Sequence, residues 1–148
     1  MTDALKIVTA RVELERFDYP QGVLEREVAR VQEMIDARQF FGTMMEDATM
    51  GVTLSKVSHV VSKLAFHGAA LMVTVEVLDT DKGRDLARIC QRAVDFPDLF
   101  EVRWGLVGSG TLHNAQDQTP TIRDDYMILQ VAWWAQTKNE AKDAAQDS

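Results

Sequence analysis

The sequence predicts an α+β fold, a single domain in which two main amphipathic helices accompany a mostly antiparallel β-sheet or barrel. Several segments alternate apolar and polar residues, which is the period of a strand with one solvated face. Two other segments repeat apolar residues at spacings of three and four, as amphipathic helices do. With 148 residues, 46% of them hydrophobic, the chain can build one sizeable core but not two.

The first strand and the first helix are expected over residues 7–16 and 20–38. Apolar and polar residues alternate through the strand, and Pro20 suits the first helical turn, where its missing N–H is not needed. The apolar stripe of this helix is Leu24, Val28, Val31 and Ile35. The charges of the opposite face are expected to be solvated and have no assigned function: Glu25, Arg26, Arg30, Glu33 and Asp36.

A β-hairpin is expected next, with arms over residues 54–66 and 70–78. The glycine of His67-Gly68 supplies the backbone freedom that its reversal needs. Asp79 or Thr80 can then cap a second helix, which is expected to end near Phe96-Pro97. The buried stripe of this helix is expected to be Leu86, Ile89, Cys90 and Ala93.

Two strands and a tail complete the expected domain. Apolar residues at positions 100, 102, 104 and 106 predict a strand that runs into a flexible loop, Gly108-Ser109-Gly110. The last strand, over residues 125–134, is apolar on both faces, so both faces are expected to be covered. The domain is expected to span residues 1–136, and residues 137–148 form a polar tail without a wide apolar face.

Composition argues against several classes of partner. A formal net charge of −7 disfavours nucleic acid, whose binding depends largely on Lys and Arg. The start of the chain lacks the pattern of a signal peptide and no segment is long and apolar enough for a membrane span, so a soluble protein without a membrane partner is expected. Three histidines and one cysteine without ligand spacing predict no metal, and the lack of a phosphate-binding glycine loop predicts no cofactor.

A series of short motifs resembles the prohead core proteases of tailed bacteriophages, which share a fold with the herpesvirus assembly proteases. The matched stretch spans residues 16–112 and consists almost entirely of scaffold residues. Its motifs, in order, are Tyr19-Pro20, Val23-Leu24-Glu25-Arg26-Glu27-Val28, a loop led by Gly42, Val57-Ser58-His59-Val60-Val61, Gly68, Leu78-Asp79-Thr80 and Gly83. The resemblance implies a prohead-protease-like fold and a role in phage head assembly.

The residues that the resemblance places at the catalytic positions cannot do the family's chemistry. The family's general base is a histidine in a Gly-Glu-Leu-Asp-His-Pro-like loop, and Glu46 falls at that position here. A carboxylate lacks the near-neutral pKa and the second nitrogen that suit imidazole to activating serine. The family's nucleophile is a serine in a Ser-Ser-Arg-Gly-like strand end, where this chain has Arg103 and Trp104 or, in a shifted alignment, Gly105 and Leu106.

Relocated chemistry and protein contacts remain as alternatives. Ser109 with His113 or His59 would be the unusual pair of an active protease, although His59 is more simply explained as a hydrogen-bonded structural residue. A serine hydroxyl within about 3.2 Å of an oriented histidine nitrogen would favour the enzyme. One of Trp133 and Trp134, which are neighbours on a strand, is expected to point outward as a possible protein contact.

Two functions follow, and a third reading stays open. The favoured one is a noncatalytic virion or prohead structural protein, a core, cement or decoration component that binds itself or capsid and scaffold proteins. The alternative is an active serine protease that cleaves those precursors during maturation. Both place the chain in the host cytoplasm during assembly and then in the prohead or virion head. The third reading is an unrelated small α+β binding domain.

Overall fold

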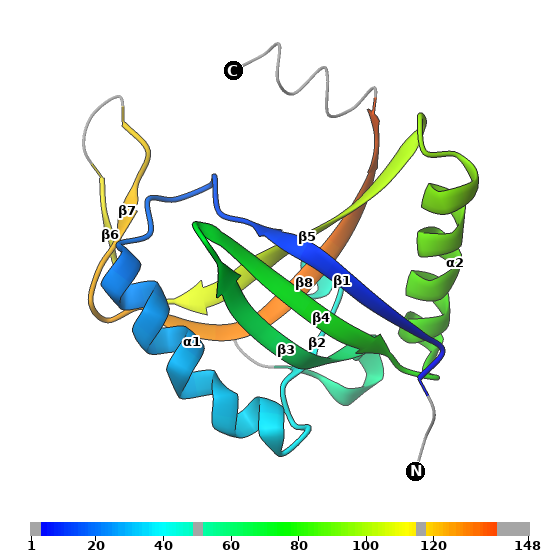
Figure 1. The fold of residues 1–148 in the computed structure, drawn as a ribbon, viewed down its shortest axis with the longest axis horizontal. Coiled ribbons are helices and arrows are strands. Elements are labelled where there is room, and N and C mark those ends of the chain that lie inside the picture. Colours follow the sequence, from blue (N-terminus) through cyan, green and yellow to red (C-terminus); the bar gives the residue numbers. More distant parts are fainter. Residues whose placement is uncertain (1–3, 49–51, 115–117, 139–148) are drawn as a thin grey trace.

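The computed structural model describes residues 4–48, 52–114 and 118–138, and it contains one six-stranded sheet and two long helices (Figure 1). The helices are α1 (Gln21–Asp36) and α2 (Asp81–Asp95). Two short 3₁₀ turns are η1 (Met45–Asp47) and η2 (Leu54–Lys56). The strands are β1 (Lys6–Glu13), β2 (Phe41–Gly42), β3 (His59–His67), β4 (Ala70–Val77), β5 (Phe100–Ser109), β6 (Leu112–His113), β7 (Thr121–Ile122) and β8 (Met127–Thr137).

The sheet is mostly antiparallel and curves nearly into a barrel. Its strand order is β2-β3-β4-β1-β5-β8, and only the β1–β5 pair is parallel within it. An isolated bridge between Met44 and Trp133 brings the segment after β2 against β8, so the two ends of the sheet approach each other. The predicted α+β class, with a largely antiparallel sheet or barrel and two helices in a single domain, is confirmed.

The helices lie at opposite sides of this sheet, α1 against β3 and β8 and α2 against β4 and β5 (Figure 1). The predicted cap of α2 is confirmed, because the Thr80 hydroxyl accepts a hydrogen bond of 2.9 Å from the Gly83 amide. Leu86 and Cys90 of its stripe are buried, and Ile89 and Ala93 are partly buried. Among the described helices, none is both long and apolar enough to cross a membrane.

The five charged residues predicted to be solvated on α1 are all exposed, but the same helix also carries a buried charge. Glu27, which had no assigned place, is only 2% exposed, and its carboxylate accepts hydrogen bonds from Arg30 and from the Ile128 amide. Arg26 also donates to two backbone carbonyls just before β8, and Arg30 donates to the Ile128 carbonyl within β8. These charged side chains therefore attach α1 to β8. The role depends on the tertiary fold, because their partners lie about one hundred positions away in the sequence.

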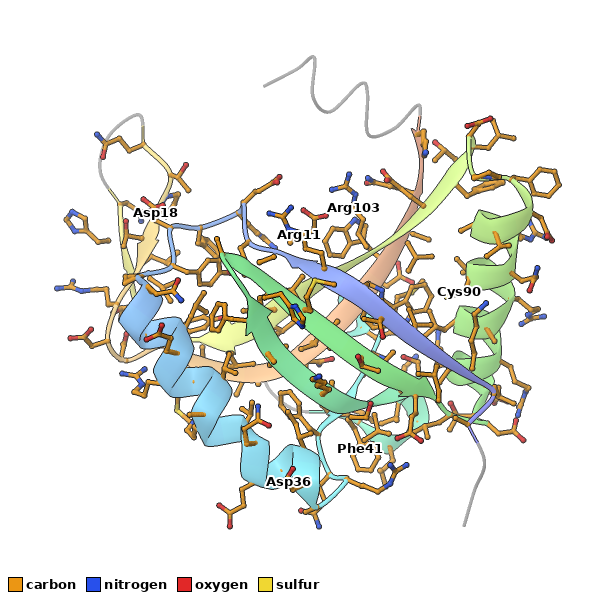
Figure 2. All side chains as sticks on the ribbon, viewed as in Figure 1. Arg11, Asp18, Asp36, Phe41, Cys90 and Arg103 are labelled. Atoms are coloured by element: carbon orange, nitrogen blue, oxygen red, sulfur yellow. The ribbon has the colours of Figure 1, made fainter. Side chains whose placement is uncertain are left out.

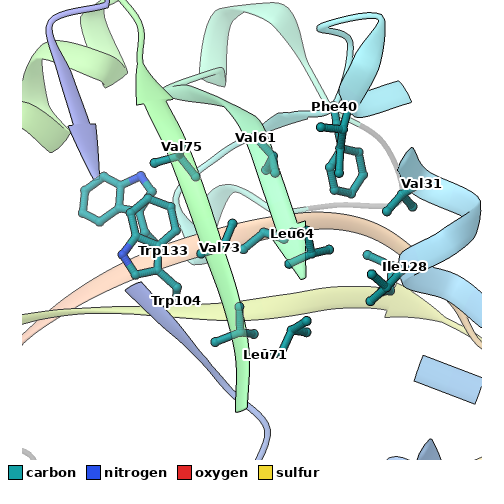
Figure 3. Packing of buried hydrophobic residues seen from close by; sticks show 14 of the residues in the cluster. Val31, Phe40, Val61, Leu64, Leu71, Val73, Val75, Trp104, Ile128 and Trp133 are labelled. Carbon is teal, nitrogen blue, oxygen red and sulfur yellow. The ribbon is translucent and has the colours of Figure 1, made fainter. Parts of the chain in front are cut away.

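The core joins both halves of the sheet (Figure 3). Val75 of β4 pairs with Val61 of β3, Val73 pairs with Leu64, and the rings of Trp104 and Trp133 lie beside β4 in the same cluster. Both tryptophans are 1% exposed or less, and they are directly paired in the β5–β8 ladder. The last strand is buried at three successive residues, Val131, Ala132 and Trp133, so its predicted cover on both faces is confirmed over that stretch.

Two predicted local structures are wrong. Residues 54–58 are not strand: Leu54 is 84% exposed, its segment forms η2 with local hydrogen bonds, and β3 begins at His59. Gly108 and Ser109 are not a loop, since they belong to β5 and pair with Ile128 and Met127. A Cβ at position 108 would come within 2.4 Å of the Tyr126 ring, so this glycine serves close packing rather than a turn.

The other element boundaries differ by a few residues. The first strand ends at Glu13, three residues earlier than predicted, and β8 continues to Thr137. The hairpin reverses at the predicted Gly68, between β3 and β4. From residue 139 onward, the predicted polar tail lies outside the described residues.

Candidate functional site

A buried polar network lies where β2 and β3 meet β8. The Ser58 hydroxyl is 2.8 Å from His59 Nδ1, and His59 Nε2 is 2.8 Å from the carbonyl oxygen of Val131. Trp133 Nε1 donates to Ser58 Oγ over 3.0 Å. Since the bonds reach from β3 to β8, the network ties together the two ends of the sheet.

The partners of His59 determine its tautomer. The Val131 carbonyl can only accept, so Nε2 carries the proton and Nδ1 is the acceptor of the Ser58 hydroxyl proton. The edge of the imidazole packs against the Trp104 ring at a centroid distance of 5.0 Å. Burial lowers the pKa of His59 to about 4, which outweighs the opposing effect of the hydrogen bond to Val131. Near neutral pH the ring is therefore neutral.

Close backbone packing seals this network. A Cβ at Gly42 would come within 2.2 Å of His59 Nε2 and 2.4 Å of the Val131 carbonyl oxygen, so only glycine fits there. Beside it, Gln130 Oε1 accepts a bond of 2.8 Å from the Thr43 amide. The matched loop led by Gly42 thus has a packing reason for its glycine, and Gln130 is a member that periodicity alone did not reveal.

Ser58 and His59 satisfy the distance expected of a serine–histidine pair but not its accessibility. Both residues are 0% exposed. A nucleophile needs a space about 3 Å away in which a substrate carbonyl can sit, and here the Trp133 indole and the Gly42 backbone occupy the surroundings. In this conformation the pair can stabilise the fold but cannot attack a peptide bond.

The other proposed pair is not brought together. Ser109 ends β5, and His113 is exposed on the two-stranded β6–β7 sheet. Within the described ranges, no hydrogen bond joins Ser109 to His113 or to His59. The close spacing of Ser109 and His113 in the sequence had suggested a pair. Instead, β5 continues through Ser109, and His113 lies on another strand, β6.

The three positions matched to catalytic residues lie in different surroundings. Glu46 is exposed on η1, in a hollow that faces α2. Trp104 is buried against His59. Arg103 projects from β5 into an open pocket at the upper edge of the sheet in Figure 2, and its Nη1 lies 3.0 Å from Glu13 Oε1.

The pocket beside Arg103 has a volume of about 380 Å³. Its charged rim is formed by Glu13, Glu15, Arg16 and Arg103. Its other lining residues are Tyr19, Met45, Gly105, Leu106 and Trp134. None of these described lining residues is a serine, threonine, cysteine or histidine, so the pocket has an apolar floor and a mixed-charge rim but no nucleophile of those types.

Arg103 is ion-paired with two carboxylates, Glu13 and Glu101. Its Nε lies 3.3 Å from Glu101 Oε1, but this buried nitrogen has no hydrogen-bond partner of good geometry. Trp134 is opposite Arg103 in the β5–β8 ladder and is partly exposed, whereas Trp133 is fully buried. Of the two neighbouring tryptophans, Trp134 is therefore the one available to a partner.

The described part of the chain holds no cluster of three or more His, Cys, Asp or Glu side chains that suits a metal ion. Cys90 is a buried free thiol, and burial raises its pKa.

This architecture is similar to the solved structure of the bacteriophage T4 capsid assembly protease, gp21, with a TM-score of 0.68. The two chains are 16% identical, and the likeness covers 86% of this chain and 81% of that one. At that identity the likeness shows a capsid-protease-like fold and nothing finer. No model of a known protein family matches the chain, and no curated protein matches it.

Proposed function

We propose that this chain is a noncatalytic component of a phage head or prohead, which uses a protease-like fold to bind head proteins. The observation that carries the proposal is the pocket beside Arg103. It lies at the strand that the sequence matched to the family nucleophile, and the described residues that line it include no serine, threonine, cysteine or histidine. An apolar floor with Trp134 and a charged rim suits a protein segment with apolar and charged side chains.

The fold likeness supports the setting of this proposal. A solved structure with this fold is a capsid assembly protease, which supports a setting among capsid and scaffold proteins, in the host cytoplasm during assembly and later in the prohead or head. A core, cement or decoration role requires binding surfaces and no chemistry, which agrees with the exposed Glu46 and the ion-paired Arg103.

An active maturation protease is the second candidate, and one observation favours it. Ser58 is within hydrogen-bond distance of a histidine that Val131 orients. For Ser58 to act as a nucleophile, the seam between β3 and β8 would have to open, because both members of the pair are buried.

A fluorophosphonate probe, which reacts with activated serines, is expected to leave the purified chain unlabelled, because neither Ser58 nor Ser109 is both activated and accessible. Intact-mass spectrometry measures the labelling, with trypsin, a serine protease, as the positive control. Incubation with capsid and scaffold precursors is expected to give no cleavage. Labelling or cleavage that disappears in Ser58→Ala or Ser109→Ala would establish the protease instead.

Trp134→Ala is expected to weaken binding to the capsid or scaffold precursor by about 2 kcal/mol or more, because a tryptophan in a pocket is a typical binding hot spot. Biolayer interferometry with the immobilised precursor measures the affinity. Phe41→Ala, which truncates a partly buried aromatic residue of β2 outside that pocket, is the matched control and is expected to bind as the wild type does. Equal affinity of Trp134→Ala and the wild type would contradict this role for the pocket.

A further inference from the structure

The end of α2 and the loop that follows it expose three large apolar side chains within six residues. Val94 is 64% exposed, Phe96 51% and Leu99 54%. We call these three residues the α2-end patch. They lie where α2 passes into β5, at the right of Figure 1. Apolar side chains gathered in this way on a small protein are characteristic of a protein interface.

The backbone holds this patch in one shape. The Phe96 amide donates to the Arg92 carbonyl, and the amides of Leu99 and Phe100 both donate to the Phe96 carbonyl. The Phe96 ring also contacts the Phe100 ring edge-on, with centroids 6.3 Å apart. Since the loop is already ordered, a partner that binds it has little conformational entropy to remove.

A complementary hollow lies beside the patch. It has a volume of about 220 Å³, and Ile89, Phe100 and Ala135 give it apolar walls with Arg92 at its rim. The same small region thus presents both protruding apolar side chains and an apolar recess.

The charges around the patch are also complementary to one another. Arg92 and Asp98 are both exposed, and within the described residues neither side chain has a hydrogen bond or ion pair. The two side chains carry opposite charges and lie close together in the sequence, as the protruding patch and its hollow lie close together on the surface. In a twofold contact each residue of one copy meets its complement on the other, so such a surface can pair with itself.

We propose that the α2-end patch and its neighbouring hollow form a twofold interface with a second copy of this chain. The patch of each copy enters the hollow of the other, and Arg92 of each copy faces Asp98 of the other. This deepens the proposed function, on which it rests for its setting, by naming one partner of the head component as the chain itself.

The test is the oligomeric state of the full chain, measured by size-exclusion chromatography with light scattering and by sedimentation over a wide concentration series. A dimer is expected. Leu99→Ser, Arg92→Asp and Asp98→Arg are each expected to raise the dimer dissociation constant at least about tenfold, and the double variant Arg92→Asp/Asp98→Arg is expected to recover most of the loss. Circular dichroism verifies that each variant folds.

Leu54→Ser is the matched control, because Leu54 is even more exposed but lies on η2, outside the patch, and this variant is expected to dimerise normally. A monomer at all concentrations, open-ended larger species, or a dimer that none of the patch variants weakens would overturn the interface. Those outcomes leave the proposed function standing, since probe labelling and precursor binding test it separately. Conversely, serine-dependent labelling would contradict the noncatalytic function, whereas the proposed dimer would still be judged by the sedimentation result alone.

Discussion

Replacing Glu27 with glutamine is expected to lower the free energy of unfolding by about 3 kcal/mol, the scale on which breaking a buried ion pair destabilises proteins. Glu27 is 2% exposed, and its carboxylate accepts hydrogen bonds from Arg30 Nε at 3.0 Å and from the Ile128 amide at 2.9 Å. Burial alone would raise the pKa of this carboxyl, but the bonds from Arg30 and Ile128 and the nearby Arg26 charge hold it below its ordinary value.

Glutamine keeps the size of the side chain but removes the charge, so Arg30 loses its ion partner and α1 loses part of its attachment to β8. The Arg26 and Arg30 side chains are partly solvated. The expected loss of unfolding free energy therefore lies at the lower end of the range measured for buried ion pairs. Urea unfolding followed by circular dichroism measures the change. Glu33→Gln, an exposed glutamate on the same helix, is the control and is expected to change stability by less than about 0.5 kcal/mol. Equal stability of the two variants would show that Glu27 does not anchor α1.

Acidification from neutral pH is expected to weaken the fold through His59. The folded-state pKa of this residue is lowered to about 4, below its ordinary value of 6.5, because the ring is buried. Between these two values the unfolded chain binds a proton that the folded chain does not, so stability falls as pH decreases through this window. The contribution of His59 at the lower end is a loss of about 3 kcal/mol relative to neutral pH.

The structure gives the reason for this loss. A proton on Nδ1 would remove the acceptor for the Ser58 hydroxyl, whose oxygen already accepts from Trp133. Urea titrations at a series of pH values measure the effect, and the difference between the wild type and His59→Gln isolates it from the titration of carboxyl groups. His67→Gln, which replaces an exposed histidine of β3 outside the network, is the control variant. A wild-type minus His59→Gln difference that is constant from pH 7 to about 4 would contradict the assignment.

Local patterns predicted the elements that depend on local physics. The spacing in α1 and α2, the cap at Thr80 and the hairpin reversal at Gly68 were all predictable, because each depends on residues a few positions apart. The same reasoning failed at Gly108, where the glycine accommodates the ring of Tyr126 instead of forming a turn. A glycine has the same local signature in both situations, and only the packing partner distinguishes them.

The candidate site shows a similar division. The sequence predicted that β5 and the loop after Gly42 hold the positions matched to catalytic residues, and that one of two neighbouring tryptophans points outward. It did not predict the Ser58–His59 bond, because the burial of that pair depends on β8, more than seventy positions away in the chain. The separation of Ser109 from His113 likewise depends on how far β5 extends before the chain turns.

By itself, the sequence determined the α+β class and the periodicity of most strands and of both helices. Only the tertiary structure decided that His59 is sealed at the closing seam of the sheet, that Glu27 is an anchor and that Trp134 lines an open pocket. The physical reason is that periodicity reports which side chains avoid water. Which strands become neighbours, and which polar groups then find partners in the interior, is set by contacts between distant parts of the chain.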